Sequence, residues 1–166
     1  MDRLFVDPDL SWQPVSRALV TERRIPAALV GLVGLALVTG ALLVGVGSGG
    51  GLALLVPGVV LLLGAVVAFF FVIPRIVASW RYAERDQDLL VSHGRLLRRL
   101  SVVPYGRMQV IDVSSNPISQ RLGIATVSLV TASAATDSQI PGLPTEVAHD
   151  LRDRLAAKGE AAAAGL

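Results

Sequence analysis

A continuous stretch of the chain, residues 25–74, carries no charged side chain and is rich in Leu, Val, Ala and Gly. A helix of about 20 apolar residues crosses the hydrocarbon core of a bilayer. The stretch is long enough for two such passes, and the small residues 47–51, Gly-Ser-Gly-Gly-Gly, interrupt it where a turn belongs. We therefore predict a transmembrane helical hairpin, with passes at about residues 25–46 and 52–73.

Beyond the hairpin, apolar and polar residues alternate as they do in half-buried β-strands. The alternation predicts strands over residues 88–92, 95–103, 109–113 and 124–131, and a short strand around 139–140. Residues 118–123 form an irregular or helical link between two of these strands. The pattern is that of an antiparallel meander.

The last predicted element is an amphipathic helix near the C-terminus. Apolar residues recur there every four positions, at Leu143, Val147, Leu151 and Leu155. Pro144 stands where such a helix begins and Gly159 where it ends. The fold class is therefore α+β: a two-helix transmembrane hairpin followed by an antiparallel β-barrel or sandwich capped by one C-terminal helix.

These elements divide the chain into four parts. They are a polar N-terminal arm (1–24), the transmembrane hairpin (25–74), a small β-rich domain (75–158) and a flexible tail (159–166). The hairpin contains no Asp, Glu, Lys, Arg or His. It therefore offers no ion site or proton relay and is interpreted as an anchor.

The charge balance excludes some classes of partner. Lys and Arg together number 15 and Asp and Glu 13, a formal net charge of +2. A nucleic-acid binder is expected to show a basic face, so nucleic acid is not a predicted partner. The sequence contains no cysteine, which excludes disulfides, thiol nucleophiles and cysteine-based metal sites.

Arginines flank the hairpin on both sides and predict its orientation. They are Arg17, Arg23 and Arg24 before the first pass, and Arg75, Arg81 and Arg85 after the second. The turn between the passes has no charge. The positive-inside rule then places both termini in the cytoplasm.

Small residues within the passes predict close helix packing. Within the two passes, the glycines that stand four residues from an alanine are Gly31, Gly40, Gly45 and Gly64. In lipid, such pairs let helix backbones approach closely. The contact either joins this chain to a partner or packs the two passes on each other.

The β-rich part resembles a known family. It begins with Trp80-Arg81-Tyr82, continues as DLLVSHGRLLRRLSVVPYGRMQVIDVSSNPISQRLGIATVSLVTAS and enters the last helix through IPGLP. This order and spacing over residues 80–158, behind a membrane hairpin, resembles the YdbS-like, bacterial PH type 2 membrane proteins. The matching positions with a structural role are Gly94, Pro104, Gln109, Pro117, Gln120 and Gly123.

The resemblance implies a PH-like fold of seven strands and a capping helix, in a multi-pass protein of the bacterial inner membrane. It also implies that relatives occur beside larger proteins that carry several copies of the domain. The partners expected are the bilayer and another membrane protein, for example one with several PH-like domains. A second copy of the chain is a further expected partner.

Five arginines are candidate contacts for lipid or partner. Arg107 and Arg121 lie in the part that resembles the family, and Arg75, Arg81 and Arg85 follow the second pass. An anionic headgroup or a partner's carboxylate would suit them. The alternatives are loop clamping by the guanidinium donors of the first pair and a purely topological role for the other three.

No catalytic chemistry is predicted. His93 and His149 are the only histidines, and neither has a second ligand at metal-site spacing. No phosphate-binding glycine loop or nucleophile motif is present, so no cofactor, metal or catalytic residue is assigned. We predict a non-catalytic, membrane-anchored binding and assembly module. The alternative is a sensor that binds anionic phospholipid headgroups directly.

Overall fold

The computed structural model describes residues 10–95, 97–131 and 137–165. It divides into two compact units, which are described separately below. The first combines the chain up to Glu22 with Ile76–Leu166, and the second is Arg23–Arg75. The predicted arm and tail extend into residues 1–9 and 166, which lie outside the described residues.

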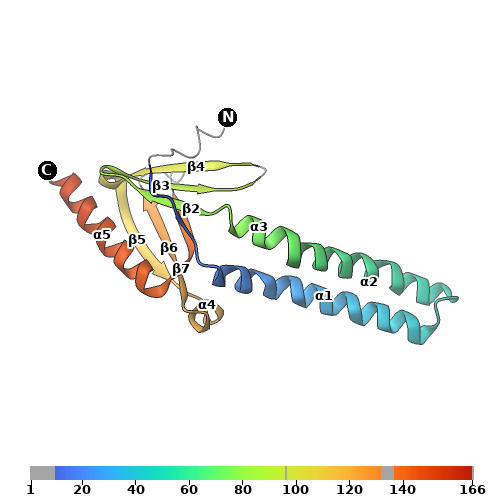
Figure 1. The fold of residues 1–166 in the computed structure, drawn as a ribbon. Coiled ribbons are helices and arrows are strands. Elements are labelled where there is room, and N and C mark those ends of the chain that lie inside the picture. Colours follow the sequence, from blue (N-terminus) through green and yellow to red (C-terminus); the bar gives the residue numbers. More distant parts are fainter. Residues whose placement is uncertain (1–9, 96, 132–136, 166) are drawn as a thin grey trace. The chain divides into compact units, whose positions relative to one another are not determined.

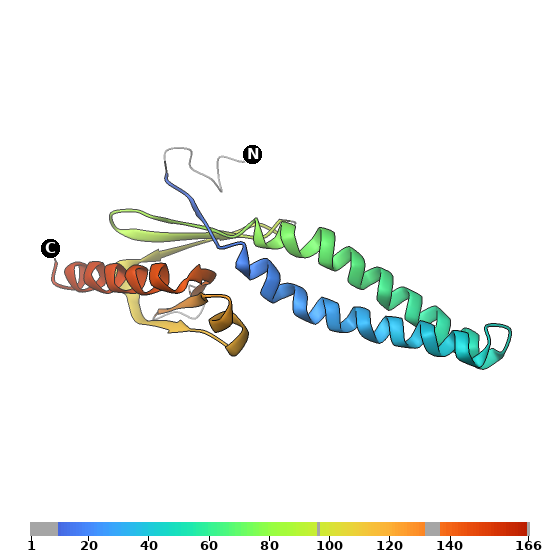
Figure 2. The same cartoon turned by 60° about the horizontal axis from the view of Figure 1, so that its bottom comes forward.

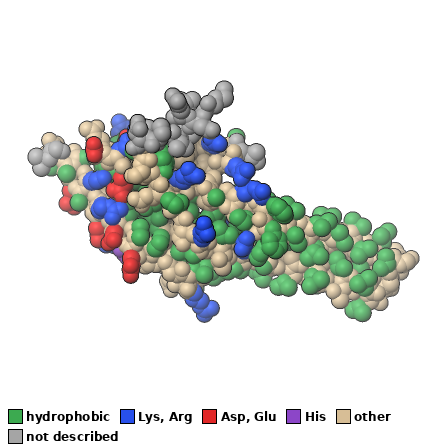
Figure 3. Space-filling view, in the orientation of Figure 1, with side chains coloured by type: hydrophobic (Ala, Val, Ile, Leu, Met, Phe, Trp, Pro, Cys, Tyr) green, Lys and Arg blue, Asp and Glu red, His purple; other side chains and the backbone are tan. Residues whose placement is uncertain are grey.

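Two long apolar helices confirm the predicted helical pair. The first is α1 (Ala18–Val44). The second begins as α2 (Gly49–Val67) and continues through a π-helical turn, η2 (Ala68–Val72), into α3 (Ile73–Val77). Ala18–Val44 and Gly49–Val77 are both long and apolar enough to cross a membrane. Figure 3 shows the outer surface of the hairpin covered by hydrophobic side chains.

The ends of the helices differ from the predicted passes because side chains cap them. Helix α1 starts at Ala18, whose N–H donates to the Ser16 hydroxyl at 3.2 Å, so it includes residues that were assigned to the arm. It ends before Gly45, which has a positive φ of 93°. Ser48 then caps α2 by accepting a hydrogen bond from the N–H of Gly51 at 3.0 Å.

Glycines form the contact between the two passes. A Cβ built on Gly34 would lie 2.9 Å from the Gly58 carbonyl oxygen, and one on Gly58 would lie 2.9 Å from the Val38 nitrogen. Gly31 faces Ala65 across the same contact, at 3.4 Å. The two passes therefore pack on each other at Gly34 and Gly58, which the small-residue spacing did not identify.

The other predicted packing glycines lie elsewhere. A Cβ built on Gly40 would lie 3.7 Å from the Leu54 side chain, an ordinary contact distance. Gly45 belongs to the turn, and a Cβ built on Gly64 would meet no atom of another part of the described chain within 4 Å.

The first unit is built on two antiparallel sheets (Figure 1). The first has the order β1-β2-β3-β4, with β1 (Gln13–Pro14), β2 (Arg81–Glu84), β3 (Asp88–His93) and β4 (Arg99–Pro104). The second has the order β5-β6-β7, with β5 (Met108–Ser114), β6 (Ile124–Thr131) and β7 (Ser138–Pro144). The sheets form an open sandwich rather than a closed barrel, which confirms the predicted fold class.

Three short or terminal helices complete this unit. The turn η3 (Tyr105–Arg107) joins the sheets, α4 (Pro117–Arg121) links β5 to β6, and α5 (Thr145–Ala163) follows β7. Helix α5 lies across the β5-β6-β7 sheet (Figures 1 and 2) and buries Leu151 and Leu155 completely. It continues beyond Gly159, where the sequence predicted its end, because alanines follow and alanine is the best helix former.

The N-terminal segment is part of the sandwich. Gln13 pairs with Tyr82 in the β1–β2 ladder, and the Tyr82 hydroxyl donates to the Gln13 side-chain oxygen. The Ser16 N–H donates to the Gly142 carbonyl at 2.9 Å, and Leu19 is buried against Gly142. Alternation alone did not predict this strand, because two residues are too short for a pattern.

Glu22 connects the start of α1 to α4. One of its carboxylate oxygens accepts hydrogen bonds from the Asn116 amide at 2.7 Å and the Ser119 hydroxyl at 2.9 Å. The Asn116 side chain in turn caps α4 by accepting from the N–H groups of Ile118 and Ser119. The first turns of α1 are thus fastened to the sandwich by Leu19 and by Glu22.

Candidate functional site

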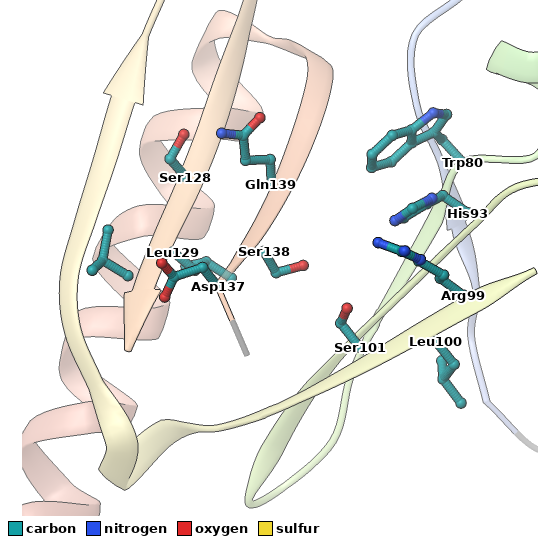
Figure 4. A pocket seen from close by; sticks show the side chains of 11 residues that line it. Trp80, His93, Arg99, Leu100, Ser101, Ser128, Leu129, Asp137, Ser138 and Gln139 are labelled. Carbon is teal, nitrogen blue, oxygen red and sulfur yellow. The ribbon is translucent and has the colours of Figure 1, made fainter. Parts of the chain in front are cut away.

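An open cleft of about 800 Å³ lies between the two sheets. Its first wall comes from the segment before β2 and from β3 and β4, and its second from β6 and β7. Figure 4 shows Trp80, His93 and Arg99 on one side, facing Ser128, Ser138 and Gln139 across the opening. Leu100, Ser101, Leu129, Val130 and Asp137 complete the lining.

The first wall is organised by a stacked pair of rings. The rings of Trp80 and His93 lie 4.3 Å apart, with 19° between their planes. Arg99 is the register partner of His93 in the β3–β4 ladder, so the two side chains project side by side. Burial lowers the pKa of His93, and the nearby Arg99 charge lowers it further. The imidazole is therefore neutral at neutral pH, and Arg99 supplies the positive charge of this wall.

The second wall is polar but not basic. Ser128 on β6 is the register partner of Gln139 on β7, which places a hydroxyl and an amide together. Asp137 accepts a hydrogen bond from the Thr131 N–H at 2.9 Å, which holds its carboxylate where β6 ends and β7 begins. The described residues that line the cleft thus offer one cation, one anion, several neutral polar groups and an aromatic stack.

The structure does not bring Arg107 and Arg121 together. Arg107 ends η3, immediately before β5, and Arg121 ends α4, after β5. The seven residues of β5 extend for roughly 20 Å. Neither arginine lines the cleft, so the two do not form one binding site.

The three arginines that follow the second pass have separate environments. Arg75 donates from Nη1 to the Phe71 carbonyl at 2.9 Å and lies over the Phe71 ring. Arg81 is exposed on β2. Arg85 belongs to the β2–β3 turn, where its carbonyl accepts from the Tyr105 hydroxyl at 2.9 Å. None of the three lines the cleft.

The residues that matched the family have structural positions. Pro117 is in the first turn of α4, Gln120 donates to the Ser115 carbonyl at 3.4 Å, and the Gly123 carbonyl accepts from the Thr145 N–H. Gly94 lies in the β3–β4 hairpin, Pro104 ends β4, and Gln109 lies at an irregularity in the β5–β6 register. These residues shape turns and strand ends rather than the cleft.

A polar cluster that sequence reasoning missed fastens α5 to β2. Arg154 donates to one Glu84 carboxylate oxygen at 2.8 Å, and Lys158 donates to the other at 3.3 Å. Lys158 also reaches the Tyr105 hydroxyl at 3.3 Å. Burial by itself raises the pKa of Glu84, but the hydrogen bonds and charges of Arg154 and Lys158 outweigh it and leave that pKa below its ordinary value.

We expect Glu84→Gln to lower the free energy of unfolding by about 1 kcal/mol at pH 7, since its partners are partly exposed. Because the folded-state pKa is depressed, the carboxylate stabilises the fold above the ordinary glutamate pKa of about 4.3 and ceases to do so as pH falls through the lowered value. Urea unfolding at several pH values should therefore show the two proteins converging in acid. A difference that does not change with pH would contradict this assignment.

Metal chemistry has no support among the described residues, where no group of three or more His, Asp or Glu side chains gathers. His149 lies on the exposed face of α5, and His93 is committed to its stack with Trp80. The cleft is suited to non-covalent recognition of a partly polar, partly aromatic group.

Comparison with known proteins shows the family to which the fold belongs. Residues 26–159 match a family model described as Bacterial PH domain. The chain is similar to the UPF0699 transmembrane protein YdbS of Bacillus subtilis (strain 168), with 35% identity over 99 residues that cover 59% of this chain and 60% of that protein. No solved structure matches the chain significantly.

A second similar protein is the UPF0699 transmembrane protein YdbT of the same organism. Its identity to this chain is 27% over 90 residues, which cover 52% of this chain and 18% of that protein. The chain thus spans less than two thirds of the length of both curated relatives. The resemblance predicted from the sequence is confirmed.

Proposed function

The chain belongs to the bacterial PH domain family, and from this premise we propose that it is a membrane-anchored, non-catalytic binding module that engages another membrane protein through the cleft between its two sheets. The hairpin of α1 and α2 acts as the anchor. A protein with several PH-like domains is the partner that best fits this role.

The observation that carries this proposal is the mixed chemistry of the cleft. Arg99 and Asp137 provide one charge of each sign, while Ser128, Gln139 and the Trp80 stack offer hydrogen bonds and an aromatic surface. Polypeptide segments present the same mixture of amides, charges of both signs and apolar groups. Protein interfaces are accordingly polar with aromatic anchors.

The second candidate is a sensor of anionic phospholipid headgroups. Arg99 beside the hydroxyls of Ser101 and Ser138 favours it, because a phosphate accepts hydrogen bonds from both groups. Against it, His93 is neutral at neutral pH and Asp137 repels an anion. A headgroup pocket needs several converging bases, and among the described residues that line this cleft Arg99 is the one Lys or Arg side chain.

A photo-crosslinking residue placed in the cleft tests the proposal. Ser101 lines the cleft, whereas the adjacent Val102 on β4 does not line it and is 41% exposed. We expect a crosslinker at Ser101, in full-length protein within native membranes, to capture one specific protein that the Val102 position does not capture. Capture of lipid alone from Ser101, or identical products from both positions, would overturn it.

We also propose that the protein lies in a bacterial inner membrane with both termini on the cytoplasmic side. The arginines at both ends of the hairpin support this orientation. The absence of cysteine makes this testable with single thiols. Gly47→Cys in the open turn should react with a membrane-impermeant maleimide on intact cells, and Leu97→Cys, at an 85% exposed position, should not. The reverse labelling pattern would contradict the orientation.

A further inference from the structure

Strand β5 is an open sheet edge. It is the outer strand of the β5-β6-β7 sheet and pairs only with β6 in the described part of the chain. Alternate residues of an edge strand direct their N–H and C=O groups away from the sheet, which is a template for another strand. β5 runs for seven residues, and Val110 on it is 54% exposed. An edge of this length is normally paired or covered.

A groove of about 410 Å³ lies beside this edge, between β5 and α5. Its strand side includes Met108 and Ile111, and its helix side includes Ala156 and Gly159. These small helix residues leave the space open. Because α5 continues beyond Gly159, Ala163 extends the same wall.

The charged residues of the groove would pair with those of a second copy related by a twofold axis. Arg152 and Glu160 both line it, four residues on either side of Ala156 along α5. If two α5 helices lie antiparallel and meet at Ala156, Arg152 of each copy faces Glu160 of the other. Among the described residues of the single chain, Arg152 forms an ion pair with its exposed neighbour Asp153, at 2.7 Å, and such surface pairs contribute little stability.

The sequence of β5 favours a twofold axis at the same place. Antiparallel pairing of two β5 strands keeps both helices on one face when the axis passes through a residue. An axis through Asp112 would place two carboxylates directly opposite each other, which is destabilising. An axis through Ile111 gives the longest overlap and sets Val110 opposite Asp112. Ile111 and Ala156 line the same groove, so one axis serves both the strands and the helices.

We propose that two copies of the chain associate through β5 and α5 about a twofold axis at Ile111 and Ala156, which joins their three-stranded sheets into one continuous sheet. Isologous contacts of this kind close on themselves and leave no further edge exposed at β5. The cleft is lined by other strands, so the dimer forms independently of what the cleft binds.

Single cysteines in the full-length chain within native membranes test the dimer. Opposed residues of an antiparallel pair lie about 5 Å apart, which is within disulfide range. Mild oxidation should therefore convert Ile111→Cys to a covalent dimer, while Val130→Cys, at a 40% exposed position on the central strand, stays monomeric. Equal dimer yield from both positions, or none from Ile111→Cys, would overturn the proposal.

Two further tests use other positions, and the first of them does not depend on the folding of the Ile111→Cys chain. Differently tagged Val110→Cys and Asp112→Cys chains, both altered at exposed positions, should crosslink to each other when co-expressed. Arg152→Glu should lower Ile111→Cys dimer yield roughly tenfold, which corresponds to about 1.4 kcal/mol, and adding Glu160→Arg should restore it. The twofold arrangement would be contradicted if the Val110→Cys and Asp112→Cys chains did not crosslink. It would also be contradicted if adding Glu160→Arg did not restore the dimer yield.

Discussion

Replacing Gly142 by alanine is expected to lower the free energy of unfolding of the sandwich by about 2–5 kcal/mol. Gly142 has a positive φ of 71°, which alanine adopts at a cost. A Cβ at this position would also lie 2.6 Å from the Leu19 Cβ. The added methyl group therefore displaces the start of α1 from the sandwich.

The chain provides a matched control for this experiment. Gly123 has a similar φ of 66°, but its built Cβ meets no other part of the described chain within 4 Å. Gly123→Ala should therefore show only the backbone cost of about 1–2 kcal/mol. Both tryptophans, Trp12 and Trp80, lie outside the hairpin, so urea unfolding of the full-length protein in micelles can be followed by their fluorescence.

The comparison of the two glycines isolates the contact with Leu19. In a Leu19→Ala background the further cost of Gly142→Ala should shrink, since part of the clashing side chain is gone. Equal costs for Gly142→Ala and Gly123→Ala would show that Leu19 does not occupy this position. The start of α1 would then not be fastened to the sandwich in the way described above.

Replacing Gly58 by valine is expected to separate the two membrane helices. A Cβ there would lie 2.9 Å from the Val38 nitrogen and 3.0 Å from the Gly34 carbonyl oxygen. Both are backbone atoms that cannot rotate away. The overpacking should cost about 1–3 kcal/mol, which is enough to reduce the population of the close-packed hairpin roughly tenfold.

An introduced disulfide reports on this packing. Gly31 and Ala65 face each other with 3.4 Å between the built and the existing Cβ, so a Gly31→Cys, Ala65→Cys pair should oxidise readily in the parent chain. Gly58→Val should suppress this disulfide, whereas Gly64→Val should leave it intact, because no other part of the described chain lies within 4 Å of a Cβ built there. Equal oxidation in both valine variants would contradict the contact at Gly34 and Gly58.

Local patterns predicted much of the fold. The charge-free stretch of residues 25–74 predicts the hairpin because a bilayer core tolerates no unpaired charge. Alternation of apolar and polar residues predicts β6, and a four-residue repeat predicts α5. Each of these signals lies within a single element, so neighbouring residues are sufficient to read it.

The long-range contacts could not be predicted in the same way. Glu22 and Ser119 are distant in the sequence, and no local pattern links a charged helix residue to the cap of α4. The Glu84 cluster with Arg154 and Lys158 is a similar case. Small-residue spacing indicated that the passes pack closely, but the rotation of each helix determines that Gly58 rather than Gly64 lies at the contact.

The residues that line the cleft could not be predicted from local sequence patterns either. Arginines were favoured as candidates because they stand near turns and matched positions, yet Arg107 and Arg121 lie at opposite ends of β5. The cleft instead takes Arg99 from a hairpin and Asp137 from the start of β7. These residues meet only when the two sheets stack, so the pairing of the sheets had to be known first.

Gentle purification of the full-length protein from native membranes is the most direct test of the proposed function. Mass spectrometry would identify the proteins and lipids that remain bound, with an Arg99→Ala, Asp137→Ala variant as the matched control. We expect one membrane protein at a fixed stoichiometry, lost from the variant, together with lipids that match the bulk membrane. Recovery without a partner protein but enriched in one anionic lipid would contradict the assembly module and favour the headgroup sensor.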